Sequence, residues 1–154
     1  MYKLFVMDVD GTLTDGKIYM SANGEIMKAF HVKDGYGIAN ILKEKGIQTA
    51  IITGRKSEIV EQRAKELKVD YVYQGVHDKL SCLKKLVEEI GCTMEEVVYV
   101  GDDVNDLDCM TEVGLSCCPN DAHKKVKDRV GFVAQTKGGD GAVREIIDEI
   151  CQTF

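Results

Sequence analysis

The sequence predicts a Rossmann-like α/β fold, in which helices cover both faces of a mostly parallel β-sheet. Two observations predict this fold. Six short apolar runs have the length of buried strands, and segments with helical periodicity lie between most of them. Strands that alternate with helices form βαβ units, whose crossovers place the helices against the faces of a parallel sheet.

The first two elements lie at the amino terminus. Residues 4–7 (LFVM) are uniformly apolar and are expected to form a buried strand. Residues 17–32 then interrupt the alternation, because two β-prone stretches flank the sequence Ala22-Asn23-Gly24-Glu25. Asn-Gly is a strong hairpin signal, since both residues tolerate positive φ at the centre of the turn. We therefore expect residues 17–32 to form a β-hairpin flap between the first strand and the first helix.

The remaining elements follow in regular order. A helix over 36–45 is closed by Gly46, a helix over 58–68 begins after Ser57, and a helix over 79–90 ends at Gly91. Two more helices are expected over 107–113 and 142–151. Strands are expected at 49–52, 71–73, 97–100, 115–118 and 132–134.

Composition and charge limit the kind of protein. The 154 residues are expected to form one domain over 1–154, and the net charge of −6 gives no electrostatic reason to expect nucleic acid or an anionic membrane as a partner. The sequence has neither a run of about 18 apolar residues nor a signal-peptide pattern, so we expect a cytoplasmic protein. The six cysteines lack CxxC spacing, which favours reduced residues with packing roles.

Two acidic clusters follow expected strands. Asp8-Val9-Asp10-Gly11-Thr12 ends the first strand, and Asp102-Asp103-Val104-Asn105-Asp106 follows the strand at 97–100. Asp8 and Asp10 are two residues apart and can face the same side of an extended chain. Carboxylates this close repel each other unless a cation or a shared proton lies between them, and Mg²⁺ prefers oxygen ligands. The sequence therefore predicts a magnesium site where the strands end.

Phosphate-binding groups occur at the same edge. Thr53 and Gly54 end the strand at 49–52 and offer a hydroxyl and a backbone amide, and Lys79 opens a helix whose amino end favours an anion. Each piece alone has an ordinary structural interpretation as a turn, a helix cap or a solvated charge. Four separate segments that converge on one sheet edge favour a functional site.

These residues resemble the four motifs of the haloacid dehalogenase superfamily of phosphatases, in the same order. The motifs are DVDGT at Asp8, ITG at Thr53, the motif lysine at Lys79 and GDDVND at Asp102. The resemblance implies that Asp8 is a nucleophile that forms an aspartyl-phosphate and that Asp10 is the general acid and then the general base. It further implies that Thr53, Gly54 and Lys79 hold the phosphoryl oxygens, that Asp8, the backbone carbonyl of Asp10 and Asp102 bind Mg²⁺, and that Asp103 and Asp106 orient their neighbours.

A more specific resemblance covers nearly the whole chain. FHVKDGYGI from Phe30, ITGRK from Ile52, NDAH from Asn120 and GGDGAVRE from Gly138 are similar to the 3-deoxy-manno-octulosonate 8-phosphate phosphatase family. The resemblance implies hydrolysis of a phosphorylated eight-carbon keto-sugar acid on the route to lipopolysaccharide. It also implies a homotetramer whose hairpins meet at its centre. It assigns substrate contacts to Lys33, Asp34, Gly35, Tyr36, Arg55 and Arg63.

Spacing argues separately against a cap domain. Only 43 positions separate Asp10 from Thr53, and 26 separate Thr53 from Lys79. These intervals already hold the hairpin, two helices and two strands, and a cap would need about 50 further residues. Cover for the site must then come from the hairpin, another subunit or a large substrate, because restricted water favours this chemistry.

Alternative functions stay open at this point. A relative acts on nine-carbon keto-acid 9-phosphates and tends to carry glutamate after the Thr-Gly pair, so Arg55 favours the eight-carbon substrate. Lys33 and Asp140 depart from the arginine that is common in the eight-carbon family. A non-catalytic assembly module is the second alternative, and retention of all four motifs argues against it. A receiver domain is disfavoured because DxDGT lies in the first segment and Leu80, not proline, follows Lys79.

Overall fold

The computed structural model describes residues 1–152 and confirms the α/β fold class. Its main sheet is fully parallel, with six strands in the order β5-β4-β1-β6-β7-β8. In chain order these strands are β1 (Leu4–Met7), β4 (Gln48–Ile52), β5 (Tyr71–Tyr73), β6 (Val97–Val100), β7 (Leu115–Cys118) and β8 (Phe132–Val133). All six agree with the predicted strands to within one residue at each end.

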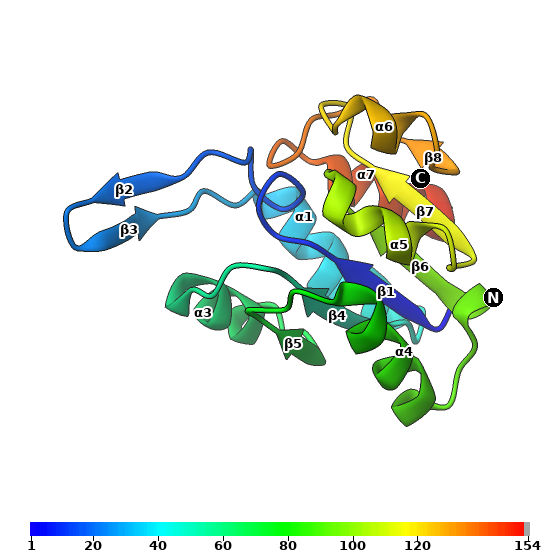
Figure 1. Ribbon diagram of the computed structural model, residues 1–154. Coiled ribbons are helices and arrows are strands. Elements are labelled where there is room, and N and C mark those ends of the chain that lie inside the picture. Colours follow the sequence, from blue (N-terminus) through cyan, green and yellow to red (C-terminus); the bar gives the residue numbers. More distant parts are fainter. Residues whose placement is uncertain (153–154) are drawn as a thin grey trace.

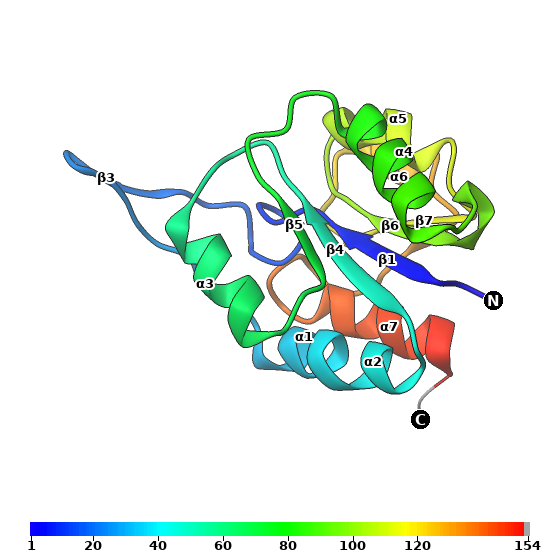
Figure 2. The same ribbon diagram turned by 90° about the horizontal axis from the view of Figure 1, so that it is seen from below.

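Helices cover both faces of this sheet, as Figure 2 shows. One face carries α1 (Val32–Tyr36), α2 (Leu42–Glu44), α3 (Glu58–Glu66) and α7 (Ala142–Cys151). The other face carries α4 (Lys79–Ile90), α5 (Leu107–Met110) and α6 (Lys124–Lys127). Alternate strand residues divide accordingly: Phe5 and Met7 belong to the core under α1, α3 and α7, whereas Leu4 and Val6 belong to the core under α4 and α5.

The first helical segment begins four residues earlier than predicted. It starts at Val32, continues through a π-helical turn at Gly37–Ile41, and ends before Gly46, whose φ is +72°. Two glycines hid this start from the sequence pattern, and both are used for close packing. A Cβ at Gly35 would lie 2.7 Å from Arg63, and a Cβ at Gly37 would lie 2.9 Å from Ile147.

The hairpin is confirmed, but its turn differs from the prediction. The antiparallel pair β2 (Tyr19–Ser21) and β3 (Gly24–Met27) projects away from the body of the molecule (Figure 1). Ser21 pairs with Gly24, so the turn residues are Ala22 and Asn23. Of the predicted Asn-Gly pair only Gly24 has positive φ, at +116°. The side chain of Ser21 accepts a hydrogen bond from the backbone N–H of Asn23, which stabilises this alternative turn.

Other differences are small. The segment predicted as a helix over 107–113 is helical only to Met110 and is preceded by a 3₁₀ turn at Val104–Asp106. Short helical turns at Met94–Glu96 and Lys124–Lys127 were not predicted. The described residues contain no cap domain, as predicted, and no helix among them could cross a membrane. All six cysteines are free, as expected.

Candidate active site

The parallel sheet brings the predicted motifs to one edge. A cavity of about 210 Å³ lies beyond the carboxyl ends of β1, β4 and β6. Ligands bind at this edge in open α/β sheets. Its lining residues come from three separate segments: Asp8 and Asp10 after β1, Thr53, Gly54 and Arg55 after β4, and Asp102, Asp103 and Asn105 after β6.

Asp8 lies at the buried floor of this cavity. Asp8 is 6% exposed. Its backbone N–H donates to the carbonyl of Val100, which fixes the end of β1 beside β6. The Nζ of Lys79 lies 3.3 Å from Asp8 Oδ1. Burial and the charge of Asp106 raise the pKa of Asp8 to about 6, although Lys79 acts in the opposite direction.

Lys79 is held by a buried network. Its Nζ donates to Asp106 Oδ1 at 2.8 Å, and the hydroxyl of Tyr99 donates to the same oxygen at 2.7 Å. Burial lowers the pKa of Lys79, but Asp8 and Asp106 outweigh it and hold that pKa above its ordinary value. Burial and Asp106 also raise the pKa of Tyr99 well above its ordinary value, so the hydroxyl stays protonated and donates.

Three carboxylates form a group that could hold a metal ion. One oxygen from each of Asp8, Asp102 and Asp106 lies within 4.8 Å of the others. Burial, followed by the charges of Asp8 and Asp106, raises the pKa of Asp102 to about 8. Lys79 is the cation among them, so negative charge is in excess, and a divalent cation would relieve this repulsion. The residues present therefore fit a divalent metal.

Asp106 is the least available of the three as a ligand. Its Oδ1 accepts from Lys79 and Tyr99, and its Oδ2 accepts from the backbone N–H groups of Asp102 and Asp103 at 3.2 and 3.3 Å. Within residues 1–152, the Asp102 side chain by contrast accepts one hydrogen bond, from Thr12 Oγ1 at 3.2 Å. Asp8 and Asp102 are thus the better placed ligands, and Asp106 organises the groups around them.

Glycines allow the acidic loops to approach each other. Gly11 has φ of +87°, and a Cβ there would overlap the carboxylate of Asp102. A Cβ at Gly101 would lie 2.5 Å from the carboxylate carbon of Asp106. Gly138 packs against the backbone of Gly11 in the same way, so the late Gly138-Gly139 segment covers the first acidic loop. Gly11 belongs to the DVDGT motif, but its steric requirement depends on the distant Asp102 and cannot be seen in the sequence.

The hairpin contributes groups that the sequence analysis missed. Lys28, directly after β3, forms an ion pair with Asp10, and Glu25 pairs with the same ammonium group. Arg55 approaches Asp10 and Glu25 at 3.8 Å each. Tyr99 was missed as well, because in the sequence it is one apolar-looking position in a buried strand. No motif marks Lys28, and only the fold of the hairpin brings it to Asp10.

The predicted substrate contacts are dispersed in the structure. Arg55 lines the acidic cavity, and Arg63 lines a cavity of about 370 Å³ that also includes Lys28. Lys33 lies in a different cavity, beside Arg144. Tyr36 is 56% exposed, and Arg144 lies over its ring.

Asp34 and Gly35 are buried within this chain. Asp34 is 2% exposed, and its Oδ1 accepts from the backbone N–H of Arg144 in the first turn of α7. Burial is the main cause that raises the pKa of Asp34 to about 6. Gly35 packs against Arg63. These contacts join α1 to α7 and α3.

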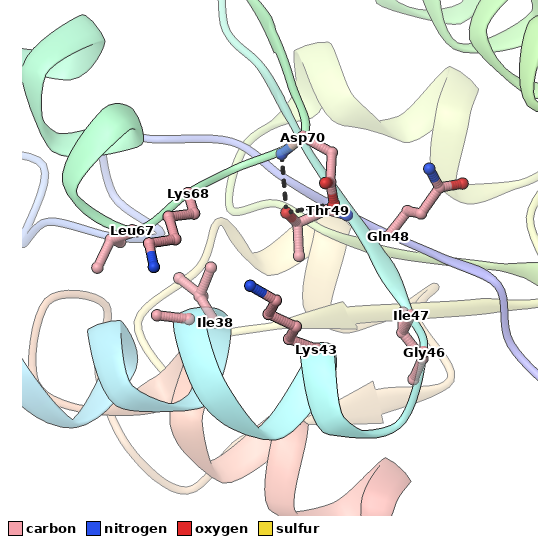
Figure 3. Close-up of a pocket in the computed structure, with 10 residues that line it drawn as sticks. Ile38, Lys43, Gly46, Ile47, Gln48, Thr49, Leu67, Lys68 and Asp70 are labelled. Carbon is pink, nitrogen blue, oxygen red and sulfur yellow. Dashed lines mark hydrogen bonds between the residues drawn. The ribbon is translucent and has the colours of Figure 1, made fainter.

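A further cavity, of about 300 Å³, lies at the opposite end of β4 and is shown in Figure 3. Asp70 Oδ2 accepts from the backbone N–H and the hydroxyl of Thr49, which in turn accepts from the backbone N–H of Asp70. These bonds fix the start of β5 beside β4. The cavity's charged groups are otherwise the exposed Lys43 and Lys68, so its polar contacts have a structural explanation.

Comparisons with known proteins agree with this geometry. Residues 72–146 match the haloacid dehalogenase-like hydrolases. The 3-deoxy-D-manno-octulosonate 8-phosphate phosphatase of Escherichia coli K12 is 47% identical over 146 residues, which cover 95% of this chain and 77% of the relative. The corresponding enzyme of Yersinia pestis is 45% identical over 148 residues, which cover 96% of this chain and 79% of that protein.

Solved structures agree over nearly the full length. A crystal structure of the Yersinia pestis phosphatase matches with a TM-score of 0.94 and 44% identity over 98% of this chain and 81% of that chain. The phosphatase of Moraxella catarrhalis, in complex with a magnesium ion, a phosphate ion and a KDO molecule, matches with a TM-score of 0.94 and 40% identity over 98% and 86%. The enzyme class predicted from the motifs is therefore confirmed. The chain belongs to the haloacid dehalogenase-like hydrolases and, within them, to the phosphomonoesterase family of the 3-deoxy-D-manno-octulosonate 8-phosphate phosphatases.

Proposed function

We propose that this enzyme hydrolyses 3-deoxy-D-manno-octulosonate 8-phosphate through an aspartyl-phosphate on Asp8, with Mg²⁺ as cofactor, in the cytoplasm and on the route to lipopolysaccharide. The observation that carries the proposal is the convergence of Asp8, Asp102 and Lys79 at one edge of the sheet, in a chain 47% identical to phosphatases of this substrate. Retention of all these groups argues against a non-catalytic assembly module.

The proposal gives each motif residue a role in the reaction. Asp8 attacks phosphorus as the bond to the sugar oxygen breaks, and Asp10 donates a proton to that oxygen. Asp10 then takes a proton from the water that attacks the aspartyl-phosphate, which releases phosphate and restores Asp8. Thr53, Gly54 and Lys79 hold the phosphoryl oxygens in both halves.

The metal would be held by Asp8, Asp102 and the backbone carbonyl of Asp10, with Asp103 and Asp106 supporting them. When bound, a divalent cation at this position supplies charge neutralisation for the transferring group. Support for this assignment comes from the excess negative charge around Asp102 and from the magnesium ion in the Moraxella catarrhalis structure.

Two groups of substrate contacts are proposed, one within the cavities of this chain and one in the assembled oligomer. Arg55 is the cation of this chain that lines the acidic cavity and is proposed to bind the substrate there. Arg63 lines a second cavity together with Lys28, the residue that pairs with Asp10. A long sugar acid bound beside Asp10 could therefore reach Arg63. Exposed Lys33 and Tyr36 are proposed to act in the assembled oligomer, whereas buried Asp34 and Gly35 hold their segment in place.

The substrate proposal has a direct test. With Mg²⁺ present, kcat/KM for the eight-carbon 8-phosphate should exceed that for hexose 6-phosphates by about 100-fold or more, because the carboxylate adds a charged contact. Phosphate release measured in parallel on a nine-carbon keto-acid 9-phosphate decides between the two sugar acids. Arg55→Gln should reduce the preference for the sugar acid about tenfold. Equal slow turnover of all substrates would refute the proposed specificity and leave the phosphatase chemistry intact.

A homotetramer assembled through the hairpins is the second part of the proposal. Met20, Ile26 and Met27 on the projecting hairpin are 59%, 60% and 49% exposed, and several large apolar side chains left exposed on one element favour an interface.

The double variant Met20→Ser/Ile26→Ser should therefore dissociate the tetramer in sedimentation velocity and lower activity at least about tenfold. Asn23→Ser in the turn is the matched control and should change neither. A double variant that sediments as a monomer with full activity would contradict the link between assembly and catalysis.

A further inference from the structure

The hairpin places a buried ammonium group against Asp10. Lys28 directly follows β3, and its side chain is only 1% exposed. Its Nζ lies 2.5 Å from Asp10 Oδ1 and 2.9 Å from Glu25 Oε2. A buried ammonium group is costly unless it is paired, so these two carboxylates account for its burial. Lys28 thus joins the flap directly to Asp10.

The two oxygens of Asp10 are held differently. Lys28 binds Oδ1, whereas Arg55 Nε lies 3.8 Å from Oδ2, beyond hydrogen-bonding distance. Among the described residues, none forms a hydrogen bond with Oδ2. The Arg55 side chain is also 52% exposed, so water screens its charge. A carboxyl group fixed through one oxygen presents its other oxygen in a defined direction.

Glu25 completes the arrangement from within the hairpin. It is three residues before Lys28 and accepts from the same ammonium group, and Arg55 Nη2 lies 3.8 Å away. Although partial burial raises the pKa of Glu25, the hydrogen bond and charge of Lys28 outweigh this and hold that pKa below its ordinary value. Glu25 therefore stays ionised and restrains Lys28 in its position over Asp10.

We infer that Lys28 is a positioning residue for Asp10, which it orients so that Oδ2 faces the oxygen of the leaving group. The inference rests on the proposed role of Asp10. In the first half of the reaction, the phosphorus–oxygen bond to the sugar breaks as Asp8 bonds to phosphorus, and the proton on Oδ2 moves to the departing oxygen. The carboxylate that remains is balanced by Lys28. In the second half, Oδ2 takes a proton from the attacking water as the bond between phosphorus and Asp8 breaks.

Leaving-group dependence tests this role. An alkyl phosphate needs a proton on its departing oxygen, whereas p-nitrophenyl phosphate releases a stabilised phenolate and needs little help. Lys28→Met should lower kcat on the sugar-acid phosphate about 10- to 100-fold, with KM changed less than about threefold, and lower kcat on p-nitrophenyl phosphate less than about threefold. Lys28→Arg should recover most of the loss, because it restores a cation at the same place.

The controls separate this role from a structural one. Lys17→Met removes an exposed lysine from the other end of the hairpin segment and should leave kcat on both substrates unchanged. Asp10→Asn sets the full size of the leaving-group effect, and thermal unfolding checks that every variant is folded. If Lys28→Met lowers kcat on both substrates by the same factor, or lowers it on neither, the positioning role is wrong while the proposed function stands. If Asp10→Asn itself fails to discriminate between the substrates, the proposed role of Asp10 fails, and the inference fails with it.

Discussion

Replacement of Asp8 by asparagine is expected to lower kcat by at least about a thousandfold, the largest effect of any single substitution in this enzyme. An amide of the same shape cannot form the acyl-phosphate, because its oxygen is a far weaker nucleophile than a carboxylate oxygen. The surrounding structure should tolerate the change. The Asp8 side chain contacts Lys79, which Asp106 also holds at 2.8 Å. Lys79 would therefore keep a partner.

Two measurements check this prediction. Phosphate release gives kcat, and rapid acid quenching with labelled substrate gives the phosphorylated protein, which should form on the wild type and not on Asp8→Asn. Mass spectrometry of the variant excludes deamidation back to aspartate as the source of residual activity. Asp103→Asn is the matched control, because the Asp103 side chain caps the turn at Val104 on the cavity rim. Asp103→Asn should lower kcat less than about tenfold. Labelled protein that still forms on Asp8→Asn would place the nucleophile elsewhere.

The regular elements were predictable because their signals are local. Four apolar residues in β1 and four in β6 are buried on both faces, so no neighbour had to be known to recognise them as strands. The end of α4 was equally clear, because Gly91 adopts φ of +81°, a conformation that glycine takes without strain. In the same way, the motif carboxylates could be located because the carboxyl ends of parallel strands meet at one edge.

The features that were missed depend on contacts between distant segments. The start of α1 at Val32 was hidden because Gly35 lowers helix propensity, and its packing against Arg63 can be seen only in three dimensions. The hairpin signal was correct, but the turn shifted by one residue because the Ser21 side chain supports another geometry. Lys28 reaches Asp10 only because the segment that follows β3 returns to the site. Periodicity carries no information on such a contact.

Asp102 should have opposite effects on stability with and without metal. Burial and the charges of Asp8 and Asp106 raise its pKa from an ordinary value of 3.8 to about 8. Without metal, Asp102 therefore binds more protons in the folded protein than in the unfolded chain between about pH 4 and pH 8. The contribution of Asp102 to stability must then fall as pH rises through this range. Asp102→Asn removes the ionisation, while its side-chain oxygen can still accept from Thr12.

In EDTA at pH 8, Asp102→Asn should therefore have a higher Tm than the wild type, by about 3 °C or more, which for a chain of this size corresponds to about 1 kcal/mol. Near pH 4 the difference should vanish, because Asp102 is then protonated in the folded protein. With millimolar Mg²⁺ the order should reverse. The wild type gains binding free energy that depends on metal concentration, and the variant has lost a ligand. Its kcat should also fall at least about 100-fold, because the charge on the transferring phosphoryl group is no longer offset.

The reversal distinguishes a metal ligand from an ordinary buried acid. A structural carboxylate would change Tm in the same direction in EDTA and in Mg²⁺, since its contacts do not depend on the ion. Asp70→Asn is a suitable comparison, because its carboxylate is committed to the backbone N–H and hydroxyl of Thr49 at the far end of β4. It should lower Tm equally under both conditions. If Asp102→Asn behaves like Asp70→Asn, the two acidic clusters do not share a cation, and the electrostatic basis of the proposed mechanism is lost.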